Sequence, residues 1–135
     1  MSRNGFSLIE LLIVIVIIGI IVVIATPAFM ELKKTSQANM ACANLRYLAN
    51  AEEVFYMRTD HTQYTTLDVL HQNGYLDERF ASGTANIAGY SYEADAGSHR
   101  FTIWARPAPG IDNPVFYVDN SFTVKHANGS PVTFN

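Results

Sequence analysis

The sequence predicts an α+β protein in which one long N-terminal α-helix, membrane-spanning over its first half, packs on a small antiparallel β-sheet. Three observations predict this plan. An apolar run lies near the N-terminus, residues 31–58 then contain neither glycine nor proline, and the last third alternates short strand-like runs with turn residues. The chain has 135 residues, so about 100 remain beyond the apolar run, enough for one small domain.

The N-terminal apolar run is long enough to cross a membrane. Every residue from Leu11 to Ala25 is apolar or glycine, and Glu10 is the only charged residue between Phe6 and Met30. A helix of this length spans a hydrocarbon core of about 30 Å. A carboxylate in such a segment costs up to about 3 kcal/mol near the bilayer centre and usually marks a function.

Two other interpretations of this segment are a secretory signal peptide and a plain membrane anchor. A signal peptide has a basic start, a short apolar core and a cleavage site of small residues. Here Arg3 is the only basic side chain before the run, the run is long, and Ala25-Thr26-Pro27-Ala28 is a poor cleavage site. A plain anchor leaves Glu10 without a role.

The segment Gly5-Phe6-Ser7-Leu8-Ile9-Glu10 resembles the type III signal sequence of type IV prepilins and pseudopilins. In that family a prepilin peptidase cuts after the glycine that ends a short leader, here residues 1–5. The resemblance implies cleavage between Gly5 and Phe6, N-methylation of Phe6, and an assembly role for Glu10. It also implies that Gly19 and Pro27 lie where the family's helix loosens in the filament.

The expected chemistry joins the new N-terminus to Glu10. The freed amine of Phe6 would be positive, and Glu10 lies four residues on, on the same helical face and about 6 Å along the axis. Within one chain the first-turn N–H groups compete for this carboxylate, so we expect the pair to form between subunits. Such a pair is strongly attractive in a low dielectric. The alternative is that Glu10 only reaches toward the membrane interface.

Gly19 and Pro27 are the predicted weak points of the helix. Glycine in a helix costs about 1 kcal/mol relative to alanine. Pro27 removes one hydrogen bond and clashes with the carbonyl of Val23. The residues themselves predict a kink, and the resemblance adds a segment that unwinds during packing.

One helix is expected over residues 6–58, with two apolar stripes on nearly opposite faces of its second half. One stripe packs on the chain's own domain, and the other is available to neighbouring helices in a filament. A larger domain that wraps the helix is the alternative, and the sequence does not say which stripe does which. The first stripe is Ala38, Ala41, Leu45, Leu48 and Phe55, interrupted by Glu52, and the second is Met40, Ala43, Tyr47, Ala51 and Val54.

The domain organisation is predicted as a leader over residues 1–5, a transmembrane and filament-core helix over 6–30, and a globular domain over 31–135. After a loop at 59–63 we expect a short helix over 66–72 that ends near Gly74. An antiparallel meander follows from about residue 89, since its connections are short. Its expected strands are 90–93, 100–106, 115–118 and 122–125.

No catalytic motif is present, so we expect no enzyme activity, no cofactor and no metal. The histidines are scattered and are expected at the surface, and the single cysteine, Cys42, is expected to pack, with lipid attachment or oxidation as alternatives. Major pseudopilins hold calcium in a loop of the sheet domain, but the aspartates and asparagine here are more typical of a plain turn. The histidines are His61, His71, His99 and His126, and the possible calcium ligands are Asp112, Asp119 and Asn120.

The predicted function is that of a structural subunit of a type IV pilus, which supports attachment or twitching motility. The alternatives are a pseudopilin of a type II secretion system and a membrane-anchored periplasmic binding module that does not polymerise. The expected location is the bacterial inner membrane, as a single-pass protein, and then the cell surface as an extracellular filament. Expected partners are copies of itself in a helical filament, prepilin peptidase and the pilus or secretion machinery. No nucleic acid is expected, because the net charge is −3 and no basic cluster is present.

Overall fold

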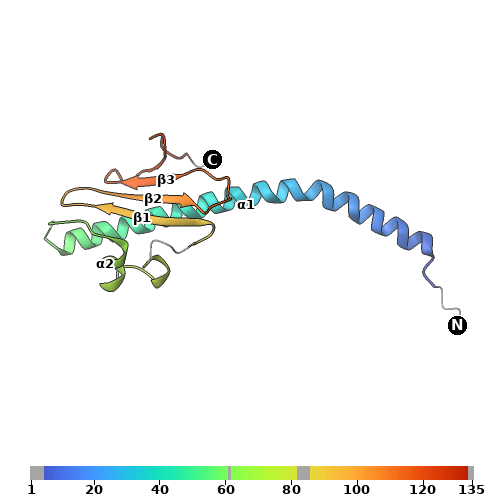
Figure 1. Ribbon diagram of the computed structural model, residues 1–135, viewed down its shortest axis with the longest axis horizontal. Coiled ribbons are helices and arrows are strands. Elements are labelled where there is room, and N and C mark those ends of the chain that lie inside the picture. Colours follow the sequence, from blue (N-terminus) through green and yellow to red (C-terminus); the bar gives the residue numbers. More distant parts are fainter. Residues whose placement is uncertain (1–4, 61, 82–85, 134–135) are drawn as a thin grey trace. The chain divides into compact units, whose positions relative to one another are not determined.

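The computed structural model describes residues 5–60, 62–81 and 86–133. The chain divides into two compact units, Met1–Thr35 and Ser36–Asn135. Helix α1 (Leu8–Arg58) runs through both (Figure 1). The second unit also contains α2 (Leu67–Gln72), a 3-10 helix η1 (Glu78–Phe80) and four strands.

Helix α1 has 51 residues and confirms the single long helix. It begins at Leu8 rather than at Phe6, because the backbone N–H of Ser7 is capped by the Glu10 carboxylate, an arrangement found at helix starts. It ends at Arg58, where Thr59 donates its hydroxyl to the carbonyl of Phe55 at 3.0 Å. The helix continues through Gly19 and Pro27 without a break.

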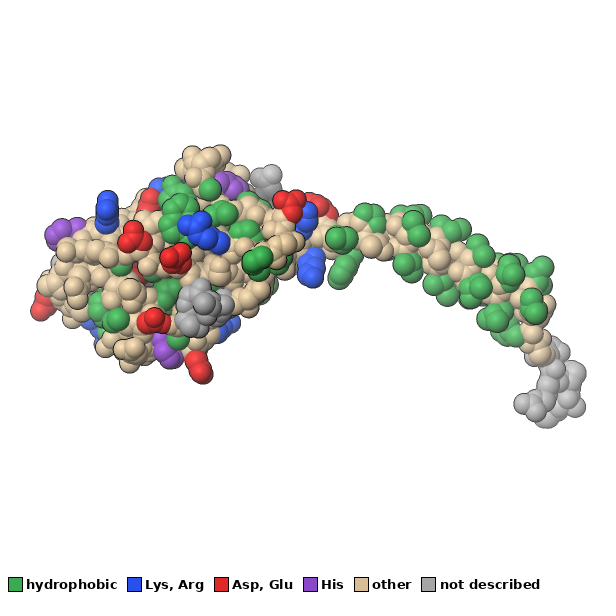
Figure 2. Space-filling model, viewed as in Figure 1, with side chains coloured by type: hydrophobic (Ala, Val, Ile, Leu, Met, Phe, Trp, Pro, Cys, Tyr) green, Lys and Arg blue, Asp and Glu red, His purple; other side chains and the backbone are tan. Residues whose placement is uncertain are grey.

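The first unit consists of the apolar part of α1. Its most apolar window has a mean hydropathy of 3.5, and none of that window is buried. Hydrophobic side chains cover this part of the helix in Figure 2. By length and composition this helix can cross a membrane.

The second unit contains a four-stranded antiparallel sheet in the order β1-β2-β3-β4, which confirms the predicted meander. Strand β1 is three residues longer than predicted, because Ala94–Ala96 pair with Phe101–Ile103. Strand β4 begins at Val124 rather than at Phe122, because Phe122 has a φ of 55° and lies in the turn before it. The strands are β1 (Tyr90–Ala96), β2 (Phe101–Pro107), β3 (Phe116–Asp119) and β4 (Val124–His126).

The core lies between the second half of α1 and the inner face of the sheet (Figure 1). Four of the five apolar residues of the first predicted stripe are buried, namely Ala41, Leu45, Leu48 and Phe55, and the helix also buries Cys42, Ala49 and Glu52. The second stripe is largely exposed, with Met40 at 49%, Tyr47 at 41% and Val54 at 44%, although Ala51 is buried. The first stripe is therefore the one that faces the sheet. The sheet contributes Tyr90, Tyr92, Phe101, Ile103, Ala105, Phe116, Val118 and Val124.

Helix α2 matches the predicted short helix to within one residue, while η1 was not predicted. Phe80, the last residue of η1, is buried and its ring lies 5.6 Å from that of Tyr92. The three residues of η1 are too few for a periodic pattern, so only the burial of Phe80 marks this element.

Candidate assembly site

The start of α1 holds the one carboxylate of the apolar segment in a capping arrangement. The backbone N–H of Ser7 donates to Oε2 of Glu10 at 2.8 Å, and the N–H of Leu11 donates to the carbonyl of Ser7 at 3.2 Å. The negative charge also complements the helix dipole. A carboxylate accepts up to about four hydrogen bonds, so this cap leaves capacity for a further donor.

Gly5 and Phe6 precede the helix in an irregular segment. The Phe6 side chain is 80% exposed, and a Cβ added to Gly5 would meet no other atom within 4 Å. An exposed, irregular segment is the kind of backbone that peptidases cut. The structure thus places the predicted cleavage position and Glu10 at the same end of α1.

Gly19 and Pro27 both lie within continuous helix. A Cβ at Gly19 would meet nothing within 4 Å, so no packing in the single chain demands glycine there. Pro27 has no N–H to give to the carbonyl of Val23. The hydroxyl of Thr26, the residue directly before Pro27, donates to the carbonyl of Val22 at 2.7 Å, a contact that often bends helices.

The second stripe of α1 is an apolar surface on the Ser36–Asn135 unit. Met40, Tyr47 and Val54 recur every seven residues, so they lie along one side of the helix, and Met57 extends the surface at 57% exposure. Tyr47 contacts Phe80 at a ring distance of 5.7 Å, and Ala51 is buried, whereas Met40 and Val54 are exposed. Spacing of this kind is typical of helices that pack on other helices.

Cys42 is 1% exposed in the core. Burial raises the pKa of its thiol to about 11, with the nearby Arg46 acting in the opposite direction. Lipid attachment and oxidation both proceed through an accessible thiolate. The structure therefore favours packing as the role of Cys42.

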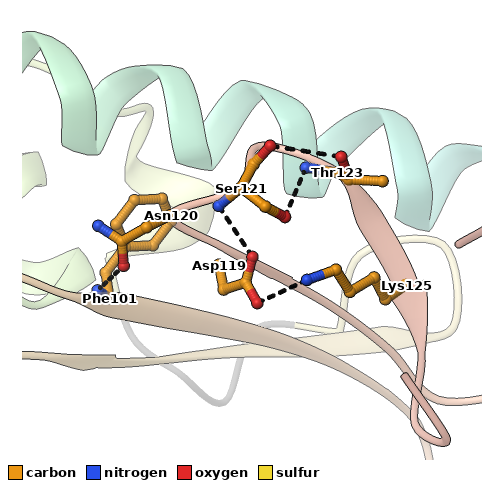
Figure 3. Close-up of polar contacts among 6 residues, drawn as sticks. All are labelled: Phe101, Asp119, Asn120, Ser121, Thr123 and Lys125. Carbon is orange, nitrogen blue, oxygen red and sulfur yellow. Dashed lines mark hydrogen bonds and ion pairs between the residues drawn. The ribbon is translucent and has the colours of Figure 1, made fainter. Parts of the chain in front are cut away.

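The turn between β3 and β4 uses its polar side chains internally (Figure 3). Asp119 accepts from Lys125 Nζ through Oδ2 at 2.8 Å and from the N–H of Ser121 through Oδ1 at 2.9 Å. Asn120 Oδ1 accepts from the N–H of Phe101 at 2.8 Å. Desolvation raises the pKa of Asp119, but its hydrogen bonds with Lys125 and Ser121 outweigh this and hold the pKa below its usual value.

These contacts oppose a calcium site at Asp119 and Asn120, because their oxygens already accept from protein donors. Within residues 5–60, 62–81 and 86–133, no group of three or more His, Cys, Asp or Glu side chains is arranged to hold a metal. His71 Nδ1 lies 3.1 Å from the carbonyl of Leu76, His99 is exposed and His126 packs on Phe116. His61 lies outside the described residues.

Glu52 is a polar feature that the sequence pattern presented only as an interruption of the first stripe. It is fully buried, and Oε2 accepts from the N–H of Thr65 at 3.1 Å. Oε1 has no hydrogen-bond partner within the part of the chain that the structure describes. Burial raises the pKa of Glu52 to about 7, partly offset by the Thr65 bond. In the sequence, a carboxylate on an otherwise apolar stripe that faces the core was the pattern that could have indicated this buried polar group.

The long helix and the antiparallel sheet define an α+β protein whose one N-terminal helix is long and apolar enough to cross a membrane. Residues 1–26 match the family described as the prokaryotic N-terminal methylation motif. The chain is 38% identical over 95 residues to the type IV major pilin protein PilA of Myxococcus xanthus, a match that covers 70% of this chain and 39% of the relative.

Two pilus proteins of Thermus thermophilus are also similar. The type IV narrow pilus major component PilA5 is 63% identical over 41 residues, 30% of this chain and 34% of the relative. The type IV wide pilus major component PilA4 is 27% identical over 137 aligned positions, 96% of this chain and 98% of the relative. The chain thus spans well under half the length of the first two relatives. The N-terminal motif and these three matches support the type IV pilin family.

Proposed function

We propose that this chain is a structural subunit of a type IV pilus filament, with a role in attachment or motility. The observation that carries the proposal is the exposed apolar length of α1 with a single carboxylate at its start. A surface this apolar is stable only in a membrane or against other apolar surfaces. The three relatives are described as a major pilin and two pilus major components, which supports the filament over the membrane anchor alone.

In this proposal the precursor is cut between Gly5 and Phe6 by a prepilin peptidase, and Phe6 is then N-methylated. The new amine of Phe6 lies beside the cap formed by Glu10 and Ser7. The Ser7 N–H already donates to Oε2 of Glu10 in the same chain. The amine of a neighbouring subunit would therefore donate to the remaining lone pairs of that carboxylate. Neutralising both charges inside an apolar bundle fixes the axial stagger between subunits.

The proposed location changes with assembly. Before assembly, α1 holds the subunit in the inner membrane as a single span, and the pilus machinery then moves it into a filament at the cell surface. The same apolar side chains face lipid in the first state and other helices in the second. Loosening of α1 around Gly19 and Pro27 would let these helices adjust their packing.

The decisive experiment combines microscopy and mass spectrometry of material sheared from cells. We expect long fibres whose subunit begins with N-methylated Phe6. Glu10→Gln should abolish or strongly reduce fibres while leaving the precursor in the membrane. Glu31→Gln, which changes an exposed carboxylate of α1 beyond the apolar run, is the matched control and should assemble normally. Normal fibres from Glu10→Gln would refute the assembly role of that residue.

The two alternatives have weaker support. The paired oxygens of Asp119 and Asn120 disfavour the calcium turn of a major pseudopilin. An anchored binding module gives no reason for an apolar second stripe on the face of α1 that points away from the sheet. If cells made the processed protein but no surface fibres, that result would favour a pseudopilin or an anchored binding module over a pilus subunit.

A further inference from the structure

The outer face of the sheet carries a row of four side chains that the proposed assembly through α1 does not use. Glu93 on β1 is directly opposite Trp104 on β2, Trp104 is opposite Tyr117 on β3, and Tyr117 is opposite Lys125 on β4. Inward-facing residues alternate with them and are buried, so these four point away from α1. We call Glu93, Trp104, Tyr117 and Lys125 the outer row.

The outer row is held in a defined arrangement. The rings of Trp104 and Tyr117 lie 4.8 Å apart. The guanidinium of Arg106 lies 5.0 Å from the centre of the Trp104 ring, and Lys125 Nζ lies 5.7 Å from that of Tyr117. Adjacent aromatic rings with cationic side chains lying over them form an ordered, partly apolar surface.

The order of the row is acid, aromatic, aromatic, base, which makes it complementary to itself. When two such sheets face each other about a twofold axis parallel to the strands, β1 of one copy lies against β4 of the other. Glu93 then meets Lys125 of the second copy, and Trp104 meets its Tyr117. The neighbouring row Asp95, Thr102 and Asp119 places no like charges opposite each other under the same operation. A twofold interface needs this kind of self-complementarity.

We propose that the outer row binds a second copy of this chain, sheet against sheet, and so joins neighbouring filaments side by side. This rests on the proposed filament: α1 covers the inner face of the sheet, so subunits assembled through α1 direct their outer rows outward. The outer row carries both an acidic and a basic side chain, and both kinds are interspersed on the face of this unit that Figure 2 shows. A surface of mixed charge disfavours a polyanion as the occupant.

The size of the surface suits a repeated contact. Four strands about 4.8 Å apart, with a rise of about 3.3 Å per residue, give the outer row and the neighbouring row together roughly 250 Å² per copy. This area is well below that of a stable dimer interface. One such contact is weak. Many contacts along two parallel filaments act together, because each contact holds the next pair at high effective concentration.

Charge reversal tests the proposal on purified filaments. In Glu93→Lys filaments, the introduced lysine would face Lys125 of the second copy, so we expect lateral association to fall about tenfold or more, measured by low-speed sedimentation and electron microscopy. Lys125→Glu filaments should also remain single. A mixture of the two variant filaments should bundle again, since each supplies the charges that the other lacks. Glu78→Lys, an equal charge change on η1, is the control and should bundle as the unaltered protein does.

Trp104 supplies an independent readout, because it is the only tryptophan in the chain. Bundling should reduce the quenching of its fluorescence by acrylamide, and the Glu93→Lys change should abolish this protection. This measurement stands even if Lys125→Glu, which loses its contact with Asp119, fails to assemble. Bundles with a fully quenchable Trp104, bundles from Glu93→Lys filaments, or unaltered filaments that never associate would each overturn the proposal. Absence of filaments would instead refute the proposed function.

Discussion

The backbone N–H of Thr65 donates to Oε2 of Glu52 at 3.1 Å, and this contact ties the segment after α1 to a carboxylate buried in the core. The adjacent residues repeat the connection, since the Tyr64 hydroxyl donates to Glu53 at 3.3 Å. Burial raises the pKa of Glu52 to about 7, against a usual value of 4.5. Glu52 therefore keeps its proton to a higher pH in the folded chain than in the unfolded chain.

This difference in the pKa of Glu52 predicts that the free energy of unfolding falls as the pH rises. Below pH 4.5 the folded and unfolded chains both hold the Glu52 proton, and between about 4.5 and 7 only the folded chain retains it. The contribution of protonated Glu52 to the free energy of unfolding is therefore complete in acid and is lost as the pH rises through 7. From pH 5 to pH 8 we expect the free energy of unfolding to lose on the order of 2 kcal/mol through this group.

In the Glu52→Gln variant the free energy of unfolding should lack this pH dependence, because an amide does not titrate. Denaturant unfolding of the full chain in detergent, followed by Trp104 fluorescence, would measure the difference from the unaltered protein at several pH values. Glu53→Gln changes the neighbouring, partly exposed carboxylate and is the control. An unchanged pH slope in Glu52→Gln would assign the effect to other groups.

Asn120 predicts a second, local effect at the turn between β3 and β4. Its Oδ1 accepts from the N–H of Phe101 at the start of β2. Asn120→Ala leaves that donor unpaired and should lower the free energy of unfolding by about 1–2 kcal/mol. Asn128→Ala removes a similar contact to the N–H of exposed Ser130 and should cost much less, because water replaces it. Adding calcium or a chelator should not change either value.

Sequence reasoning predicted the elements whose signals are local and periodic. The single helix, the short α2 and the antiparallel meander follow from runs and turn residues. The two stripes on α1 were also visible, but the sequence could not assign them, because both are apolar. The structure assigns the first stripe to the sheet, because Leu45 and Leu48 are buried while Met40 and Val54 are exposed.

The features that the sequence did not predict depend on contacts between distant segments. Glu52 takes its character from Thr65 and from the core around it, and a one-dimensional pattern shows it only as a break in the stripe. The outer row depends on the registers of three strand pairs, which errors of one residue in the strand boundaries would scramble. Cleavage at Gly5, methylation of Phe6 and the pairing of Glu10 remain predictions.

Gly89 offers a test of packing between the start of the domain's helix and the sheet. It has a φ of 82°, and an added Cβ would lie 2.7 Å from Nε2 of Gln37 and 3.0 Å from Cδ1 of Ile111. Gly89→Ala should therefore be destabilising by about 2 kcal/mol or more. Gly110 has a φ of 86° with nothing within 4 Å, so Gly110→Ala should show only the cost of the backbone conformation, about 1 kcal/mol. Equal losses of stability in the two variants would contradict the contact with Gln37.

The two stripes of α1 predict opposite consequences for substitution. Leu48 is fully buried against the sheet, so Leu48→Ala should lower the free energy of unfolding by about 2–5 kcal/mol. Val54 is 44% exposed, so Val54→Ser should change the unfolding of the isolated subunit by less than about 0.5 kcal/mol. If the second stripe packs on neighbouring helices, Val54→Ser filaments should nevertheless dissociate at lower detergent or temperature than unaltered ones. Subunit unfolding by Trp104 fluorescence and filament loss by sedimentation separate the two effects. Val54→Ser filaments as robust as the unaltered ones would leave this surface outside the assembly.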